Sequence, residues 1–200
     1  QKSPFWEFSS IILVLKKIIR KRTLNIRKLK FDSKYKINFF DLLKILKQEK
    51  IQKGIIGGYY PVNYEIDDLD ILKKFEKKKY KVSLPLIKKN NNLDFYLWSS
   101  SDYLKINKYG IPEPNKKKLV YPDVLLVPIV AFDYRKFRLG YGGGYYDRYI
   151  ARLKKIKKFL SIGLAFDFQK VEKIKVNKFD EKLDIIITNK KIYKKWELFF

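Results

Sequence analysis

The fold is decided by the apolar run Val124–Phe132 (VLLVPIVAF) and, five residues later, the glycine-rich run Arg138–Arg148 (RLGYGGGYYDR). The apolar run predicts a central strand that is buried on both faces. The residues from Tyr145 to about Lys157 predict a helix. Glycines adopt positive φ at little cost, so the loop between strand and helix can turn successive amides toward one point. Amides gathered at a helix start bind anions, and the stretch therefore predicts a phosphate site.

Charged side chains bracket these glycines. Arg138 and Arg148 would form charge-assisted hydrogen bonds with phosphate oxygens, and Asp147 would hold a divalent cation that bridges such oxygens. A plain strand-to-helix turn would also use glycines, but it has no need of these charged neighbours. The loop lacks the Gly-Lys-Ser/Thr of a Walker A motif, and Tyr145 stands where a dinucleotide fingerprint has its third glycine.

The rest of the chain alternates between helical and strand patterns. Apolar periodicity predicts helices over residues 10–30, 34–50, 67–78 and 145–157. Short apolar runs predict strands over residues 54–60, 80–84, 93–98, 124–131, 159–165 and 185–188. We expect a long loop with a short helical piece over 99–121, and a helix or tail over 190–200.

This alternation predicts an α/β fold: a three-layer sandwich whose mostly parallel central sheet has helices on both faces. We expect a single domain over residues 10–200 behind an N-terminal extension over residues 1–9. In such sheets, ligands bind beyond the carboxyl ends of the strands. The glycine-rich run follows the central strand, so it lies where that rule places a binding site.

Composition limits the chemistry. The 200 residues contain no cysteine and no histidine, which excludes disulfides, thiolate zinc sites and imidazole bases. A metal site must use oxygen ligands, which favours magnesium. The net charge of +25 invites a nucleic-acid partner, but lysines are spread along the whole chain and only seven of its 46 basic residues are arginines. We therefore expect no obligate nucleic acid.

The apolar run Phe8–Leu15 is too short to cross a bilayer. It also lacks the preceding basic cluster and the small-residue cleavage site of a secretion signal. We expect a cytoplasmic, monomeric enzyme without a membrane partner.

Several segments, in order, resemble the 5-formyltetrahydrofolate cyclo-ligase family, also called methenyltetrahydrofolate synthetases. The signature is Val127–Asp133 with Arg138–Arg148, accompanied by Lys16–Arg20 (KKIIR), Tyr59–Glu65 (YYPVNYE), Tyr109–Pro114 (YGIPEP) and Asp180–Asp184 (DEKLD). The likeness runs from about Lys16 to Thr188, which is nearly the whole chain.

The resemblance implies an activity. Members of the family convert 5-formyltetrahydrofolate to 5,10-methenyltetrahydrofolate with ATP and magnesium, and release ADP and phosphate. The formyl oxygen takes the γ-phosphoryl group and becomes a leaving group, and a neighbouring folate nitrogen closes the ring. Phosphoryl transfer needs mainly alignment and charge neutralisation, which suits a chain without histidine.

The resemblance also implies residue roles. Catalysis would rest on Arg138, Arg148 and Tyr145, and the metal on Asp147 and Asp180. ATP would be bound by Lys16, Lys17, Arg20, Arg138, Leu139, Gly140, Tyr141, Gly142, Gly143, Gly144, Tyr145 and Tyr146. The folate would be bound by Tyr60, Glu65, Tyr109, Tyr141, Gly142, Gly143, Gly144 and Tyr145. Within that set, Glu65 would accept hydrogen bonds from pterin N–H groups.

Three residues depart from the family's pattern. Gly143 occupies a place where some members carry lysine, Phe179 stands where many bacterial members carry histidine, and Tyr109 stands where some members carry tryptophan. Two other functions are compatible with the residues. An α/β enzyme acting on a phosphorylated small molecule would bind that ligand without ATP hydrolysis, and a basic RNA-binding protein would bind with a steep salt dependence.

Overall fold

The computed structural model describes residues 4–115 and 118–194 of the chain. Its helices are α1 (Pro4–Lys30), α2 (Phe39–Gln48), α3 (Asp68–Lys77) and α4 (Tyr145–Ile156), with the short 3-10 turns η1 (Lys89–Asn91) and η2 (Asp167–Gln169). The first strands are β1 (Ile55–Gly57), β2 (Lys81–Ile87), β3 (Leu93–Trp98), β4 (Leu104–Ile106), β5 (Pro112–Pro114) and β6 (Leu119–Val120). They are followed by β7 (Val124–Pro128), β8 (Ala131–Phe132), β9 (Arg138–Leu139), β10 (Leu160–Ala165), β11 (Ile185–Thr188) and β12 (Ile192–Tyr193).

One mixed sheet organises the molecule, with the strand order β12-β11-β10-β7-β1-β2-β3-β6. Its centre is parallel: β11 pairs in parallel with β10, β10 with β7, β7 with β1, and β1 with β2. Its edges are antiparallel, where β12 joins β11 and where β3 and β6 extend the sheet beyond β2. The predicted mostly parallel central sheet is confirmed, with β7 in the middle of its parallel part.

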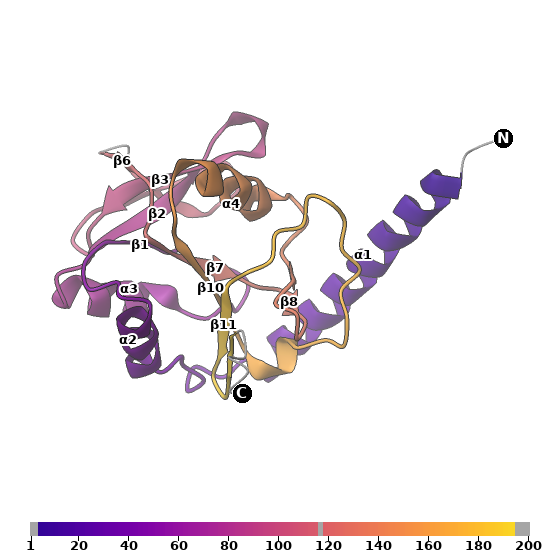
Figure 1. Cartoon of the computed structure of the whole chain (residues 1–200), viewed down its shortest axis with the longest axis horizontal. Coiled ribbons are helices and arrows are strands. Elements are labelled where there is room, and N and C mark those ends of the chain that lie inside the picture. The colour runs from indigo at the N-terminus through magenta and orange to yellow at the C-terminus, as the bar shows by residue number, and fades with distance from the viewer. Residues whose placement is uncertain (1–3, 116–117, 195–200) are drawn as a thin grey trace.

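Helices cover both faces of this sheet (Figure 1). On β7, Val124 and Leu126 pack with the buried side chains of α2 and α3, whereas Leu125 and Val127 pack with those of α4. The alternation follows from the period of two in a strand. All four of these side chains are fully buried, so the predicted strand buried on both faces and the three-layer sandwich are confirmed. The strand ends at Pro128 rather than at residue 131, and Ala131–Phe132 form β8, which pairs with β9 in a separate small sheet.

Local signals explain where the helices begin. The side chain of Asn38 accepts a hydrogen bond from the Phe40 amide at 3.0 Å and caps α2. The side chain of Asp67 accepts one from the Leu69 amide at 3.1 Å and caps α3. Such caps satisfy amides that a helix start leaves without a partner. The helix predicted over 34–50 is therefore shorter, because Asn38 fixes its start.

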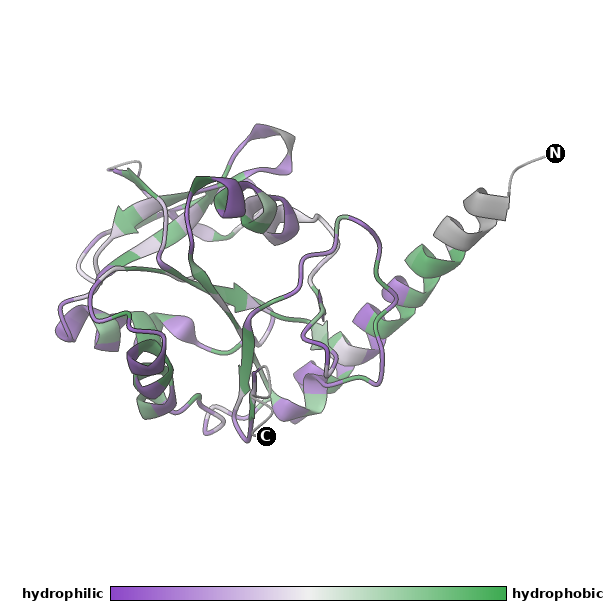
Figure 2. Cartoon of the chain, in the orientation of Figure 1, coloured by the Kyte–Doolittle hydropathy of each residue, from purple (hydrophilic) through white to green (hydrophobic). Residues whose placement is uncertain are grey.

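Helix α1 is longer than predicted and crosses the end of the sheet. It begins at Pro4, so residues 4–9 of the expected extension continue the helix, while residues 1–3 lie outside the described residues. Its N-terminal part projects from the body of the molecule (Figure 1), and Figure 2 shows apolar residues along this projecting part. Within the described ranges, no helix combines the length and the apolar character that a membrane span requires.

The prediction of a helical piece within residues 99–121 was wrong. The described residues of this region form β4, β5 and β6, and β4 and β5 pair as a hairpin. The Asn107 side chain accepts hydrogen bonds from the amides of Tyr109 at 2.9 Å and Ile111 at 3.1 Å and closes the hairpin turn. Gly110 adopts a φ of +74° there, so Asn107 and Gly110 together are a signal for a tight turn rather than for a helix.

Two smaller expectations also need correction. Strand β2 does not end at Pro85 but continues to Ile87. Its parallel pairing with β1 ends at Ser83, so a residue without an N–H can follow in the strand without breaking that ladder. The residues expected as a C-terminal helix or tail include strand β12, and residues 195–200 lie outside the described part of the chain.

Candidate active site

A cavity of about 890 Å³ lies at the carboxyl ends of the central parallel strands. Tyr59 and Tyr60, which follow β1, and Pro128, at the end of β7, contribute to its wall. The rest of the wall comes from α1, from the glycine-rich loop with the start of α4, from the β4–β5 hairpin and from residues 177–181. Segments far apart in the sequence therefore meet at the edge of the sheet where a site was predicted.

The glycine-rich loop joins β9 to α4 along this cavity. Gly142 has a φ of +105° and Gly144 a φ of +65°, both in the region that favours glycine. Gly144 is the N-cap of α4, and no side chain caps this helix. Because Gly144, Tyr145 and Tyr146 line the cavity, the start of α4 presents its amide end to whatever occupies the space.

Arg148 holds this loop in place. Its Nε and Nη2 donate to the carbonyl oxygen of Asn91 at 3.1 and 2.7 Å, and Nη2 also donates to the Gly143 carbonyl at 2.5 Å. The role predicted for Arg148 was a phosphate contact. In the structure, these donors are used on backbone carbonyls, and Arg148 ties the glycine-rich loop to η1.

Three other cations point into the cavity. The Lys16 ammonium is 4% exposed and lies 2.5 Å from Asp180 Oδ2. Arg20, one turn further along α1, donates from Nε to the Gly140 carbonyl at 2.8 Å. Arg138 Nη1 donates to the Glu181 carbonyl at 3.0 Å and lies 3.2 Å from Asp147 Oδ1. These cations come from α1 and β9 and concentrate positive charge beside the glycine-rich loop.

Burial modifies one of these cations. Desolvation lowers the pKa of Arg20, and the negative charges of Asp180 and Asp147 act in the opposite direction. The guanidinium thus lies near both carboxylates that were predicted to hold a metal. It stays charged in any accessible pH range because the unperturbed pKa of arginine is so high.

The two predicted metal ligands, Asp147 and Asp180, flank the same cavity. Asp147 Oδ1 accepts from the Glu181 amide at 3.1 Å, and Asp180 Oδ2 accepts from the Asn177 amide at 2.6 Å. Among the described residues, no three acidic side chains gather closely enough to form a metal cage on their own. Two carboxylates fit magnesium, since this ion usually takes one or two of them and completes its shell with phosphates and waters.

Glu65 is a buried acceptor in the cavity wall. It is 6% exposed, and its Oε2 accepts from the Val62 amide at 2.9 Å, while Oε1 has no hydrogen-bond partner among the described residues. Burial raises the pKa of Glu65 to about 7, although the Val62 amide, the charge of Arg27 and the side chain of Tyr141 act against this rise. An oxygen without a partner that borders a cavity suits a ligand rich in N–H donors.

Tyrosines form one rim of the cavity. The hydroxyl of Tyr145 donates to Asn91 Oδ1 at 3.0 Å and lies 3.4 Å from the hydroxyl of Tyr109. The hydroxyl of Tyr146 is buried without a partner among the described residues. Tyr60 is half-buried in the wall. These rings are therefore available as flat surfaces for a planar ligand.

The structure brings together nearly all of the predicted site residues. Every one of them lines the cavity except Lys17, which is exposed on α1 and lies outside the lining. Neighbouring positions on a helix face different directions, so Lys16 and Lys17 cannot both reach the cavity. The resemblance indicated the segment correctly, and helix geometry separates the two lysines.

Two buried residues that contact the wall of the cavity from behind were not predicted. Arg27 is 1% exposed and donates from Nη2 to the Tyr141 hydroxyl at 2.5 Å. A signal existed, because Arg27 lies eleven positions after Lys16 and shares its helix face. Asp68 is fully buried and accepts from the Tyr59 amide at 2.7 Å, and burial raises its pKa well above the ordinary value. An acidic residue in a first helical turn is too common to be a signal.

Comparisons with known proteins agree with this geometry. The sequence profile of the 5-formyltetrahydrofolate cyclo-ligase family matches residues 15–189. The 5-formyltetrahydrofolate cyclo-ligase of Haemophilus influenzae is 32% identical over 147 residues, which cover 70% of this chain and 78% of the relative. That of Escherichia coli K12 is 33% identical over 136 residues, covering 64% of this chain and 74% of the relative.

A solved structure has the same fold. The NMR structure of 5,10-methenyltetrahydrofolate synthetase from Aquifex aeolicus superposes with a TM-score of 0.72 at 29% identity, covering 90% of this chain and 92% of that one. The corresponding synthetase from Mycoplasma pneumoniae gives a TM-score of 0.66 at 25% identity, covering 87% and 98%. The chain therefore belongs to the 5-formyltetrahydrofolate cyclo-ligase family.

Proposed function

We propose that the protein converts 5-formyltetrahydrofolate to 5,10-methenyltetrahydrofolate, with ATP and magnesium consumed in the manner that the family resemblance implies. The observation that carries the proposal is one cavity that gathers a glycine-rich loop, three cations and two carboxylates. Family membership supplies the substrate class, and the charges of the cavity support the nucleotide.

The cationic side supports a triphosphate. Lys16 and Arg20 approach from α1 and Arg138 approaches from β9, so the cations reach the cavity from two elements. Phosphoryl transfer spreads negative charge over the equatorial oxygens of the transferred group, and fixed cations stabilise that charge. The amide end of α4 adds dipolar stabilisation beside them. Arg148 contributes indirectly, because it fixes the loop that carries the amides.

The acidic residues have a separate role. Asp147 and Asp180 would hold the magnesium ion, which would supply positive charge to offset that of the phosphates. Both carboxylates are already oriented by backbone amides, at 3.1 Å for Asp147 and 2.6 Å for Asp180. Such orientation reduces the entropy that ligand binding has to remove.

Glu65 and the tyrosine rim would hold the folate. The free Oε1 of Glu65 would accept from pterin N–H groups, and Tyr109 and Tyr145 would pack against the planar ring. ATP supplies the phosphoryl group that converts the formyl oxygen into a leaving group. The protein's task is then alignment: it holds the formyl oxygen in line with the terminal phosphate and the folate nitrogen near the formyl carbon.

The test is a direct assay with a matched pair of variants. Purified protein with ATP, magnesium and 5-formyltetrahydrofolate should form methenyltetrahydrofolate, followed by its absorbance, with ADP released in equal amount. Lys16→Gln should lose most of this activity, while Lys17→Gln should retain it, because only Lys16 lines the cavity. Absence of product with wild-type protein would reject the function, and equal losses in the two variants would reject the role of Lys16.

A further inference from the structure

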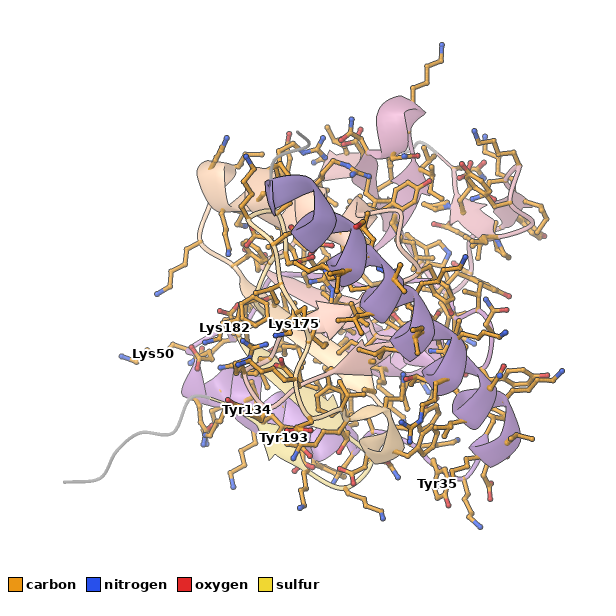
Figure 3. The ribbon with its side chains drawn as sticks, turned by 90° about the vertical axis from the view of Figure 1, so that its right-hand side faces the viewer. Tyr35, Lys50, Tyr134, Lys175, Lys182 and Tyr193 are labelled. Carbon is orange, nitrogen blue, oxygen red and sulfur yellow. The ribbon has the colours of Figure 1, made fainter. Side chains whose placement is uncertain are left out.

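The outward face of α1 carries an apolar stripe that no other part of the described chain covers. It consists of Ile11, Val14, Leu15 and Ile18, which are 56%, 55%, 39% and 57% exposed. Their spacing of three, four and seven positions places them on one side of the helix. Figure 3, which turns this side of the molecule toward the viewer, shows α1 crossing in front of the rest of the molecule.

From Ser10 onward the charges along α1 have one sign. Lys17, Lys21 and Lys28 are exposed and lie in a row along one side of the stripe, and the exposed Arg22 follows Ile18 by one turn. Between Ser10 and Phe31 the chain contains no Asp or Glu. Over these residues the outward face of α1 is therefore an amphipathic surface with an apolar stripe and basic residues beside and beyond it.

This surface is separate from the candidate active site. Lys16 and Arg20 project from the opposite side of α1 into the cavity. The family profile begins at residue 15, so Ile11 and Val14 precede the part of the chain that it matches. The stripe thus begins in a part of α1 that lies outside the match to the family.

We propose that the outward face of α1 lies flat on an anionic phospholipid bilayer. A helix with an apolar stripe and lysines beside it lies in the plane of the lipid headgroups, where it buries the stripe and contacts negative charge. Charge complementarity selects this partner. A second copy of the same face would bring two sets of basic residues together, which repel each other.

The experiment measures binding to vesicles with a variant that keeps the charge. Wild-type protein is sedimented with vesicles of phosphatidylcholine, with and without phosphatidylserine. The triple variant Ile11→Gln, Val14→Gln and Ile18→Gln replaces three of the four stripe residues and leaves every lysine. A control variant, Phe40→Gln, Tyr103→Gln and Tyr134→Gln, makes the same kind of change at side chains that are 77%, 89% and 63% exposed elsewhere.

The expected result is binding to the phosphatidylserine vesicles that survives about 0.5 M salt in part, because the stripe inserts. The stripe variant should bind at least about tenfold more weakly, and the control variant should bind like the wild type. Circular dichroism and turnover in solution should be unchanged in the stripe variant.

Three results would overturn the proposal. One is absence of vesicle binding by the wild type. The second is equal binding of the stripe variant and the wild type with complete loss in high salt, since net charge alone would then explain the attraction. The third is a wild-type dimer in sedimentation velocity that the stripe variant dissolves, since a second copy would then cover the stripe.

Discussion

Replacing Glu65 by glutamine should stabilise the ligand-free protein in a pH-dependent way. The pKa of Glu65 is raised from its ordinary 4.5 to about 7 because the carboxyl group is buried. The folded protein therefore binds this proton more tightly than the unfolded chain does, and wild-type stability falls as the pH rises between these two values. Above about pH 7 the full penalty of charging the buried group, about 3 kcal/mol, is present.

The glutamine variant carries no such penalty. At about pH 5 the side chain of residue 65 is largely neutral in the folded state of both proteins. The stability advantage of the variant over the wild type should therefore be about 2–3 kcal/mol larger at about pH 8.5 than at about pH 5. For a chain of this size that corresponds to about 5–10 °C in the melting temperature. Urea unfolding and thermal melts at both pH values, without ligand, measure the effect.

The same variant should bind folate more weakly. Hydrogen bonds to a charged acceptor contribute about 1.5–3 kcal/mol, so the KM for the folate should rise about tenfold to a hundredfold. Glu113→Gln is the control, because Glu113 is a half-buried carboxylate in the same cavity wall. If Glu65→Gln changed stability equally at both pH values, the charged form would not be penalised in the folded state, and the reasoning would be refuted.

Three further changes test the nucleotide side. Asp147→Asn should remove most magnesium-dependent turnover while leaving the circular dichroism spectrum intact, and an unchanged magnesium titration would reject Asp147 as a ligand. Gly142→Ala should raise the KM for ATP at least about tenfold, because its φ of +105° strains any side chain; an unchanged KM would show that the phosphate contacts lie elsewhere. Arg148→Lys should weaken ATP binding more than it lowers kcat, since it loosens the contact with Asn91 rather than a phosphate; a pure loss of kcat would contradict this.

Local patterns predicted the centre of the fold well. The run Val124–Phe132 and the glycines after it determine β7 and the start of α4 through burial and backbone freedom, and neighbouring residues carry both signals. The strands β4, β5 and β6 were missed because they are two or three residues long. Strands of this length leave almost no periodicity to detect, and they form through their pairing, β4 with β5 in a hairpin and β6 with β3.

The residues of the candidate site also fall into those that local motifs predicted and those that they did not. The glycines and their charged neighbours indicated the loop from the residues alone, and the family resemblance added Lys16 and Arg20, because these are carried by compact motifs. Arg27 was missed because the chain contains so many cations that its burial could not be distinguished from solvent exposure. Arg148 was assigned to phosphate because residue type alone does not show which partner a guanidinium takes. That depends on the tertiary approach of Asn91 to the loop.

The two ion pairs in the cavity, Lys16 with Asp180 and Arg138 with Asp147, make its interior close to neutral when no ligand is bound. A polyphosphate that drew the two cations away would leave two acids facing its own negative charge. A divalent ion that drew the acids away would leave the cations without counterions. Binding of both ligands together keeps the charges in the cavity balanced, so each ligand should raise the affinity for the other by the same factor. The pocket would thus admit the metal–nucleotide complex as a unit and discriminate against either half alone.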